Sequence, residues 1–116
     1  MEKEIVSISE YHAHVYYDKG TRDGATHVRE GLSRLGVWLG RWHDRPVGPH
    51  TQAMYLGVFP PERFGEIVPW LMLNREGLDI LVHPDTGNSA EDHLVNCLWL
   101  GKKLNLKEDH LRLTRH

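Results

Sequence analysis

The sequence predicts an α+β protein with a ferredoxin-like βαββαβ arrangement, in which two helices pack on one face of an antiparallel sheet. Three observations support this fold class. Residues 11–17 alternate between two sets of side chains, as in a strand, while residues 21–39 and 61–77 repeat apolar residues at helical spacing. The expected order is strand, helix, strand, strand, helix, strand, followed by a C-terminal helix. A chain of 116 residues suffices for one domain, 1–116, with one modest core.

The N-terminal third begins with the first strand and the first helix. One face of this strand carries Tyr11, Ala13, Val15 and Tyr17, and the other face carries His12, His14 and Tyr16. The following residues, DKGTRDG, are typical of a turn. Four apolar residues at helical spacing then predict an amphipathic helix over 21–39: Val28, Leu32, Leu35 and Leu39.

The middle of the chain predicts a pair of strands around a turn rich in proline and glycine. We expect a short strand over 41–45 and a second strand over 50–59. The turn between them occupies residues 46–49. These strands supply the ββ unit of the predicted order.

The C-terminal half predicts a helix, a strand and a last helix. The prolines at 60 and 61 suit the first turn of a helix that ends near Gly77. The segment LDILVH, residues 78–83, reads as the fourth strand. Residues 89–92, SAED, resemble a capping box that opens a helix extending to about residue 103.

Histidine is the unusual component of the sequence, with nine residues. If the apolar side of each strand faces the helices, His12, His14 and Tyr16 point to the opposite, open face of the sheet. We expect three residues of other strands on that face: His50, Gln52 and His83. Imidazole is the commonest metal ligand and a common acid or base. The pattern therefore predicts one metal or catalytic site from four converging histidines: His12, His14, His50 and His83.

The other polar residues have simpler explanations. Arg41 could bind a substrate carboxylate, although a charge that faces solvent is the simpler interpretation. His93 belongs to the last predicted helix, which could fold over the open face and bring this side chain near the site. The remaining histidines are expected at the surface: His27, His43, His110 and His116.

The composition argues against several classes of function. A net charge of −2 without a long basic run disfavours a nucleic-acid surface. No apolar run approaches the roughly 20 residues of a membrane span, and the first residues lack the apolar core of a signal peptide. We therefore expect a cytoplasmic protein that acts on small molecules. Cys97 is the only cysteine, which excludes an intramolecular disulfide and a thiolate metal cluster.

Several motifs occur together in the chain: YHAHVYYD, RPVGPH, FPPERFGEIVPWLMLNREGLDILVHPDTG and the DH of residues 92–93. In this order, from Tyr11 to about Leu106, they resemble the DOPA 4,5-dioxygenase family of fungi and bacteria. The resemblance implies a ferredoxin-like α+β fold and a homodimer. It also implies extradiol cleavage of a catechol by dioxygen, with DOPA or a related catecholic acid as the substrate.

The resemblance maps the histidine motifs of the family onto five residues: His12, His14, His50, His83 and His93. We expect His12, His14 and His83 to bind Fe(II), because three protein ligands leave positions open for the catechol and dioxygen. Zinc or nickel could occupy the same nitrogens. The expected catalytic residues are His50, as the acid/base group, and His93. Three residues are expected to bind the substrate: Tyr16, Gln52 and Arg41.

Two alternatives stay open from the sequence. One is a small-molecule or metal-binding protein of the same fold without ring-cleaving activity. The other is a cofactor-free monooxygenase or isomerase, in which the histidines act only as acids and bases. Metal content distinguishes these alternatives, and the sequence leaves open which histidines bind metal and which one moves protons.

Overall fold

The computed structural model describes residue 2 and residues 7–113, and its centre is a five-stranded antiparallel sheet. The sheet order is β2 (Trp38–Leu39), β3 (Ala53–Phe59), β1 (Glu10–Tyr17), β4 (Ile80–Asp85) and β5 (Leu98–Leu100). The helices are α1 (Arg22–Arg34), η2 (Pro61–Arg63), α2 (Phe64–Asn74), α3 (Ser89–Leu94) and α4 (Glu108–Leu113). This is the expected α+β, ferredoxin-like fold, extended by the edge strand β5.

The central strand is β1, which pairs antiparallel with both β3 and β4. His14 lies opposite Leu56 of β3 and Leu81 of β4. His12 lies opposite His83 of β4. Because directly opposed residues in an antiparallel pair project from the same face, this register places His12, His14 and His83 on one face. The expected neighbours of the first strand are confirmed.

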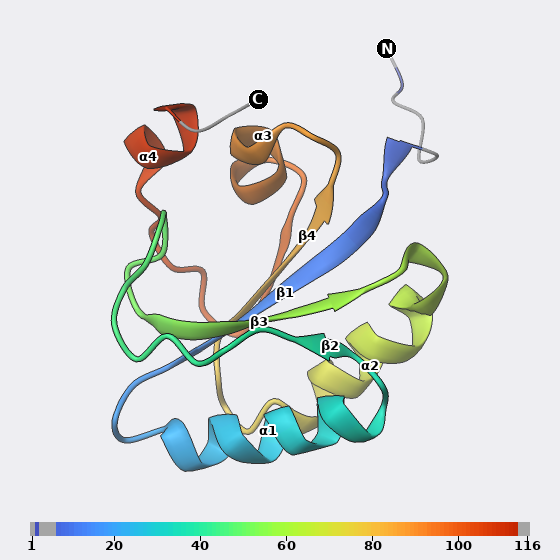
Figure 1. Ribbon diagram of the computed structural model, residues 1–116, viewed down its shortest axis with the longest axis vertical. Coiled ribbons are helices and arrows are strands. Elements are labelled where there is room, and N and C mark those ends of the chain that lie inside the picture. Colours follow the sequence, from blue (N-terminus) through green and yellow to red (C-terminus); the bar gives the residue numbers. More distant parts are fainter. Residues whose placement is uncertain (1, 3–6, 114–116) are drawn as a thin grey trace.

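The helix face of the sheet is the face covered by α1 and α2, which lie below the strands in Figure 1. Its core includes Val15 from β1, Leu32 from α1 and Leu71 from α2, all fully buried. Where α1 meets α2, Gly31 lies so close to the indole ring of Trp70 that a Cβ would overlap it. The glycine weakens the helix locally, but the packing of the two helices requires it.

The histidine face is the opposite face, which carries His12, His14, Tyr16 and His83. The chain after β4 covers part of it, and α3 and α4 lie above the strands in Figure 1. A second apolar cluster forms at one end of this face from Tyr16, Met54 and Leu81, against which Cys97, Trp99, Leu104 and Leu106 pack. No helix in the described part of the chain is long and apolar enough to cross a membrane.

Two element boundaries in the first half of the chain differ from the prediction. The first helix ends at Arg34 instead of extending to residue 39, because Gly36 adopts a left-handed conformation with φ of 77°. Residues 38–39 form β2 instead. The strand expected over 41–45 is wrong, since only a single bridge between His43 and Met54 forms there.

The third strand begins later than expected, at Ala53. His50 and Gln52 therefore lie in the loop that precedes β3, and the prediction that places them on a strand is wrong. The Gly48–Pro49 pair interrupts extended pairing in this loop, and Gly48 has a positive φ of 58°. His50 nevertheless reaches the histidine face, where it is almost fully buried.

The last predicted helix is wrong beyond Leu94, where α3 ends. Residues 98–100 form β5, which pairs with the edge of β4. A short apolar run such as LWL is compatible with either helix or strand, and the unpaired edge of β4 decides the outcome. The helix also starts from a different cap, since the Asn88 side chain accepts a hydrogen bond from the Glu91 N–H.

Candidate metal centre and catalytic site

Five histidines from four parts of the chain meet on the histidine face. They are His12 and His14 of β1, His50 before β3, His83 of β4 and His93 of α3. The rings of His83 and His93 lie 4.0 Å apart between centroids, and those of His14 and His50 lie 4.3 Å apart. His14, His50 and His83 are buried. The convergence expected for four histidines is therefore present, and α3 adds His93 as the fifth.

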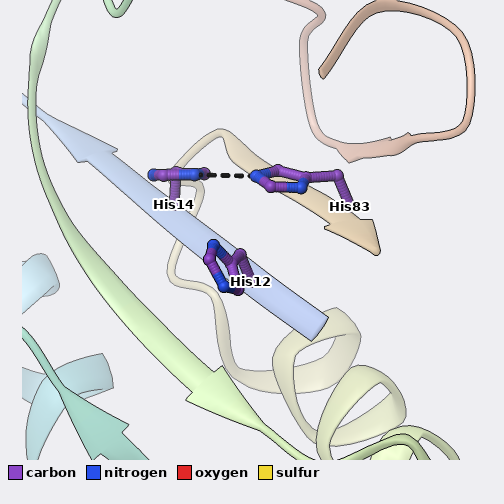
Figure 2. A group of neighbouring side chains, drawn as sticks. All are labelled: His12, His14 and His83. Carbon is purple, nitrogen blue, oxygen red and sulfur yellow. Dashed lines mark hydrogen bonds between the residues drawn. The ribbon is translucent and has the colours of Figure 1, made fainter. Parts of the chain in front are cut away.

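Two overlapping groups of three histidines have potential ligand atoms within 4.8 Å of one another. The first group, His12, His14 and His83, is the expected ligand set and is drawn in Figure 2. The second group consists of His14, His50 and His93, and so includes both residues expected to be catalytic. His14 is common to both groups, which makes it the central side chain of the site.

Backbone carbonyls hold the rings of His83 and His93. The Nδ1 atom of His83 donates to the Pro84 carbonyl at 2.9 Å, and that of His93 donates to the Ser89 carbonyl at 2.8 Å. Because a carbonyl oxygen only accepts, both Nδ1 atoms carry the proton, and each neutral ring keeps a lone pair on Nε2. Metal-binding histidines commonly have this arrangement, in which the second nitrogen donates to a carbonyl or carboxylate.

The Nε2 atom of His14 lies 3.0 Å from the Nε2 atom of His83 (Figure 2). With neutral rings, His14 donates this hydrogen bond, since Nε2 of His83 has only a lone pair. The Nδ1 atom of His14 is then buried without a hydrogen-bond partner among the described residues. Two ligands at right angles on an ion, with bonds of about 2.1 Å, are also about 3.0 Å apart. The spacing of the two Nε2 atoms therefore fits a metal ion bound by both rings.

Glu10 is a residue of the site that the sequence pattern did not identify. Its carboxylate accepts a hydrogen bond of 2.7 Å from Nε2 of His12, which leaves the lone pair of the neutral ring on Nδ1. Glu10, His12 and Asp85 also form a third group of closely spaced potential ligands. The sequence offers a signal for Glu10, because it lies two residues before His12 and so projects from the same face of an extended strand. It lies one residue before the predicted start of the strand.

Of the three residues expected to bind substrate, Tyr16 is the one that contacts the histidines. Its hydroxyl lies 2.6 Å from Nδ1 of His50. Burial raises the pKa of Tyr16, so the phenol stays protonated and can donate to or accept from His50. Gln52 is half-buried in the loop before β3, and Arg41 is exposed after β2. In the described part of the chain, neither of these two side chains forms a hydrogen bond or an ion pair.

Burial favours the neutral form of four of the five histidines: His14, His50, His83 and His93. It is the main cause that lowers the pKa of His50 and of His83 to about 3, and repulsion from His93 adds to the effect in both cases. The pKa of His14 is well below its usual range, again through burial and then through His50 and His83. Burial also lowers the pKa of His93, although the bond to Ser89 opposes this change. The neutral ring is the form that binds a metal ion.

The histidines expected at the surface differ in their positions. His27 is exposed and lies 3.2 Å from the carboxylate of Glu76. His110 is exposed and His43 is half-buried, and both are close enough to His50 to lower its pKa further. His116 lies outside the described residues.

Comparisons with known proteins place this site in a family. The sequence matches the model of the Dopa 4,5-dioxygenase family over residues 11–110. It is 31% identical to the DOPA 4,5-dioxygenase of Amanita muscaria over an alignment of 109 residues, which covers 85% of this chain and 48% of that protein. An uncharacterized 21.2 kDa protein of Botryotinia fuckeliana is 32% identical over an alignment of 109 residues, which covers 83% of this chain and 60% of that protein. The chain thus spans about half to three-fifths of the length of these curated relatives.

A solved structure is similar over nearly the whole chain. It is a crystal structure of a Nostoc punctiforme protein that is provisionally described as a dioxygenase. The two chains are 53% identical, with a TM-score of 0.95, and the match covers 97% of this chain and 98% of the other. The fold described above is therefore shared with an experimentally determined structure.

Proposed function

The chain belongs to the Dopa 4,5-dioxygenase family, and from this premise we propose that it is a metal-dependent extradiol dioxygenase. The proposed substrates are dioxygen and a catechol, either DOPA or a related catecholic acid. The observation that carries the proposal is the cluster of five histidines on the histidine face, of which His14, His50 and His83 are buried. A buried polar cluster costs stability unless it is satisfied, and a metal ion would satisfy this one.

Fe(II) is the proposed metal, held by His12, His14 and His83. When bound, it would supply a Lewis acid that accepts the catecholate oxygens and dioxygen together. Three features fit that role: the neutral rings of His14 and His83, the anchored Nδ1 of His83 and the close Nε2 pair of these two residues. Imidazole nitrogens also suit zinc and nickel, so we expect either metal in protein purified without iron.

His50 is the proposed acid/base residue. Its Nδ1 atom is hydrogen-bonded to Tyr16, so Nε2 is the nitrogen left to exchange a proton with the catechol. The Tyr16 hydroxyl can serve as donor or acceptor, and it therefore holds the ring in both tautomers. Burial lowers the pKa of His50 to about 3, and a catecholate anion beside the ring would raise it. The substrate itself would thus make His50 a competent base.

His93 is the proposed second catalytic residue. Its ring is partly buried, and the bond from Nδ1 to the Ser89 carbonyl leaves the Nε2 lone pair available. It stands 5.9 Å from the ring of His50, measured between centroids. A proton that His50 takes from the substrate therefore has a neighbouring acceptor within the same cluster.

The test is ring cleavage by the full chain after anaerobic loading with Fe(II). DOPA or caffeate is added with oxygen, and a yellow ring-fission product is followed by absorbance. Iron that is retained without product from any catechol would contradict the dioxygenase and favour a metal-binding protein. Iron that is refused at micromolar concentration would favour cofactor-free chemistry. His27→Ala is the control variant, because His27 is an exposed residue of α1, the helix that covers the opposite face of the sheet.

The expected homodimer stays a prediction. Light scattering of the full chain at several concentrations measures the molar mass in solution. A mass of twice 13.4 kDa is the expected result, and a constant mass of one chain would contradict it.

A further inference from the structure

A cavity of about 320 Å³ lies beside the histidine cluster. It is lined by His93 and by residues that follow α3, among them Trp99, Lys103, Leu104, Leu106 and Glu108. Sites for small organic ligands begin at about 300 Å³ and are mostly apolar, with a few polar groups that orient the ligand. This cavity has that size, an aromatic and aliphatic wall, and a histidine of the site at its border.

The wall of the cavity is joined to the catalytic residues. Trp99 stacks on Tyr16 with 5.8 Å between ring centroids, and Tyr16 in turn bonds to His50. Two further hydrogen bonds tie the wall to the loop of His50. Thr51 Oγ1 donates to the Asn105 carbonyl, and the Lys107 N–H donates to the Pro49 carbonyl, both at 2.8 Å. The cavity and the histidines therefore belong to one connected unit.

The charged groups of the cavity are not equivalent. Glu108 is paired with Arg112 at 3.5 Å, whereas Lys103 forms no ion pair with any residue that the structure describes. The segment 101–107 contains three lysines and no acidic residue, although the whole chain has a net charge of −2. The unpaired positive charge of the cavity thus belongs to Lys103, in a locally basic segment that attracts anions.

We propose that Lys103 determines substrate specificity by binding a carboxylate on the side chain of the catechol. The hydroxylated ring then lies toward His93, along the wall formed by Trp99, and the acid group lies at Lys103. This inference rests on the proposed function for the catecholic acid and adds the residue that recognises the acid group of its side chain. Neutral catechols lose this contact, and cationic catechols are repelled.

The test compares the binding of three probes under nitrogen: 3,4-dihydroxyphenylpropionate, 4-methylcatechol and dopamine. Binding is followed through tryptophan fluorescence, since Trp99 lines the cavity. The acid is expected to bind about tenfold or more tightly than 4-methylcatechol, as a charge-assisted hydrogen bond would produce. Lys103→Gln is expected to abolish this preference by weakening only the acid. Lys103→Arg should keep the preference, and Lys103→Glu should reverse it toward dopamine.

Lys102→Gln is the matched control, because Lys102 is absent from the lining of the cavity. Among the described residues, it bonds to Asp79 through its backbone N–H and not through its side chain. It should leave all three affinities within about twofold of the unaltered chain. The proposal is overturned if the unaltered chain shows no preference for the acid. It is also overturned if Lys103→Gln weakens the acid and 4-methylcatechol equally, or if Lys102→Gln has the same effect as Lys103→Gln.

The titrations are done with the metal-free chain and with the Fe(II)-loaded chain, so that binding is separated from turnover. A Lys103-dependent preference without ring cleavage supports this inference and contradicts the proposed dioxygenase. Ring cleavage without a Lys103-dependent preference supports the proposed dioxygenase and contradicts this inference. The two failures are therefore distinguishable.

Discussion

The helix face and the histidine face of the sheet are buried to nearly the same extent but with opposite chemistry. Val15 on the helix face is 0% exposed, and its neighbour His14 on the histidine face is 5% exposed. An apolar side chain such as Val15 stabilises the fold by roughly 1.5–3 kcal/mol when buried. A buried imidazole instead loses hydration and keeps an unsatisfied nitrogen. The comparison indicates that one face supplies stability, while the other is kept polar for a ligand.

The largest effect is expected from a substitution that removes apolar volume from the helix face. Leu32→Ala should lower the free energy of unfolding by about 2–5 kcal/mol, because Leu32 is fully buried between α1 and the sheet. Urea denaturation measures this loss. Metal stoichiometry of the folded variant should not change. A variant of unaltered stability would contradict the assignment of the main core to this face.

The next largest effect is expected from acid, which should lower the stability of the metal-free chain through the histidine face alone. Histidines in the unfolded chain have a pKa of about 6.5, whereas the pKa of His50 and of His83 is about 3 in the folded chain. Between these values the unfolded chain binds protons that the folded chain does not, so stability falls as the pH falls. Above about pH 6.5 these two residues contribute no pH dependence.

For the metal-free chain, the two histidines together predict a loss of roughly 3 kcal/mol between about pH 5.5 and 4.5. Urea denaturation at each pH measures it, after metal has been removed with a chelator. His50→Gln should reduce the slope by about one proton. A free energy of unfolding that stays constant over this interval would show that the cluster is not neutral and buried.

Removal of the central histidine should affect metal binding more than folding. His14→Ala should weaken the binding of Zn(II) or Fe(II) by more than about 100-fold, which exceeds the effect of losing a residue that only orients a ligand. His14 belongs to both trios of histidines, so neither trio can compensate. Calorimetric titration measures the affinity, with His27→Ala as the control. Full affinity in His14→Ala would contradict both ligand sets.

The smallest expected effect concerns Glu10, which holds the ring of His12. Glu10→Ala should weaken metal binding by about 10–100-fold, as expected for a carboxylate that orients a ligand. Glu10→Gln keeps an acceptor oxygen and should lose less. Glu30→Ala, on the exposed side of α1, is the matched control and should bind metal normally. Equal affinities for Glu10→Ala and Glu30→Ala would show that Glu10 does not orient a metal ligand.

The predicted and observed parts of the site differ in a systematic way. His12, His14 and His83 lie on regular strands, and the alternation of each strand predicted their common face. His50 was expected on a strand but lies in a loop, and reached the cluster for another reason: the hydrogen bond to Tyr16 and the ties of its loop to residues 105–107. Glu10 is not part of the predicted site, because it is the first residue of β1 and the ends of strands are the hardest to predict from sequence.

The C-terminal third shows the same limit in the fold itself. The sequence predicts one helix over residues 89–103. Residues 98–100 instead form β5, because the open edge of β4 offers hydrogen bonds to their backbone. The change matters for function, because Trp99 of β5 and the segment beyond β5, which includes Lys103, line the cavity. The helix expected from the sequence therefore gives no basis for predicting that Trp99 and Lys103 line one cavity.

The sequence by itself determined the two faces of the strands that carry His12, His14 and His83, whereas the register that brings His12 opposite His83 came from the structure. The physical reason is local, since side chains on a strand alternate whatever the strand packs against. Only the tertiary structure decided the rest of the site: the position of His50, the approach of His93 on α3, the bond from Glu10 and the cavity beside Lys103. These depend on loops and short elements, whose conformations are set by the surfaces that they contact.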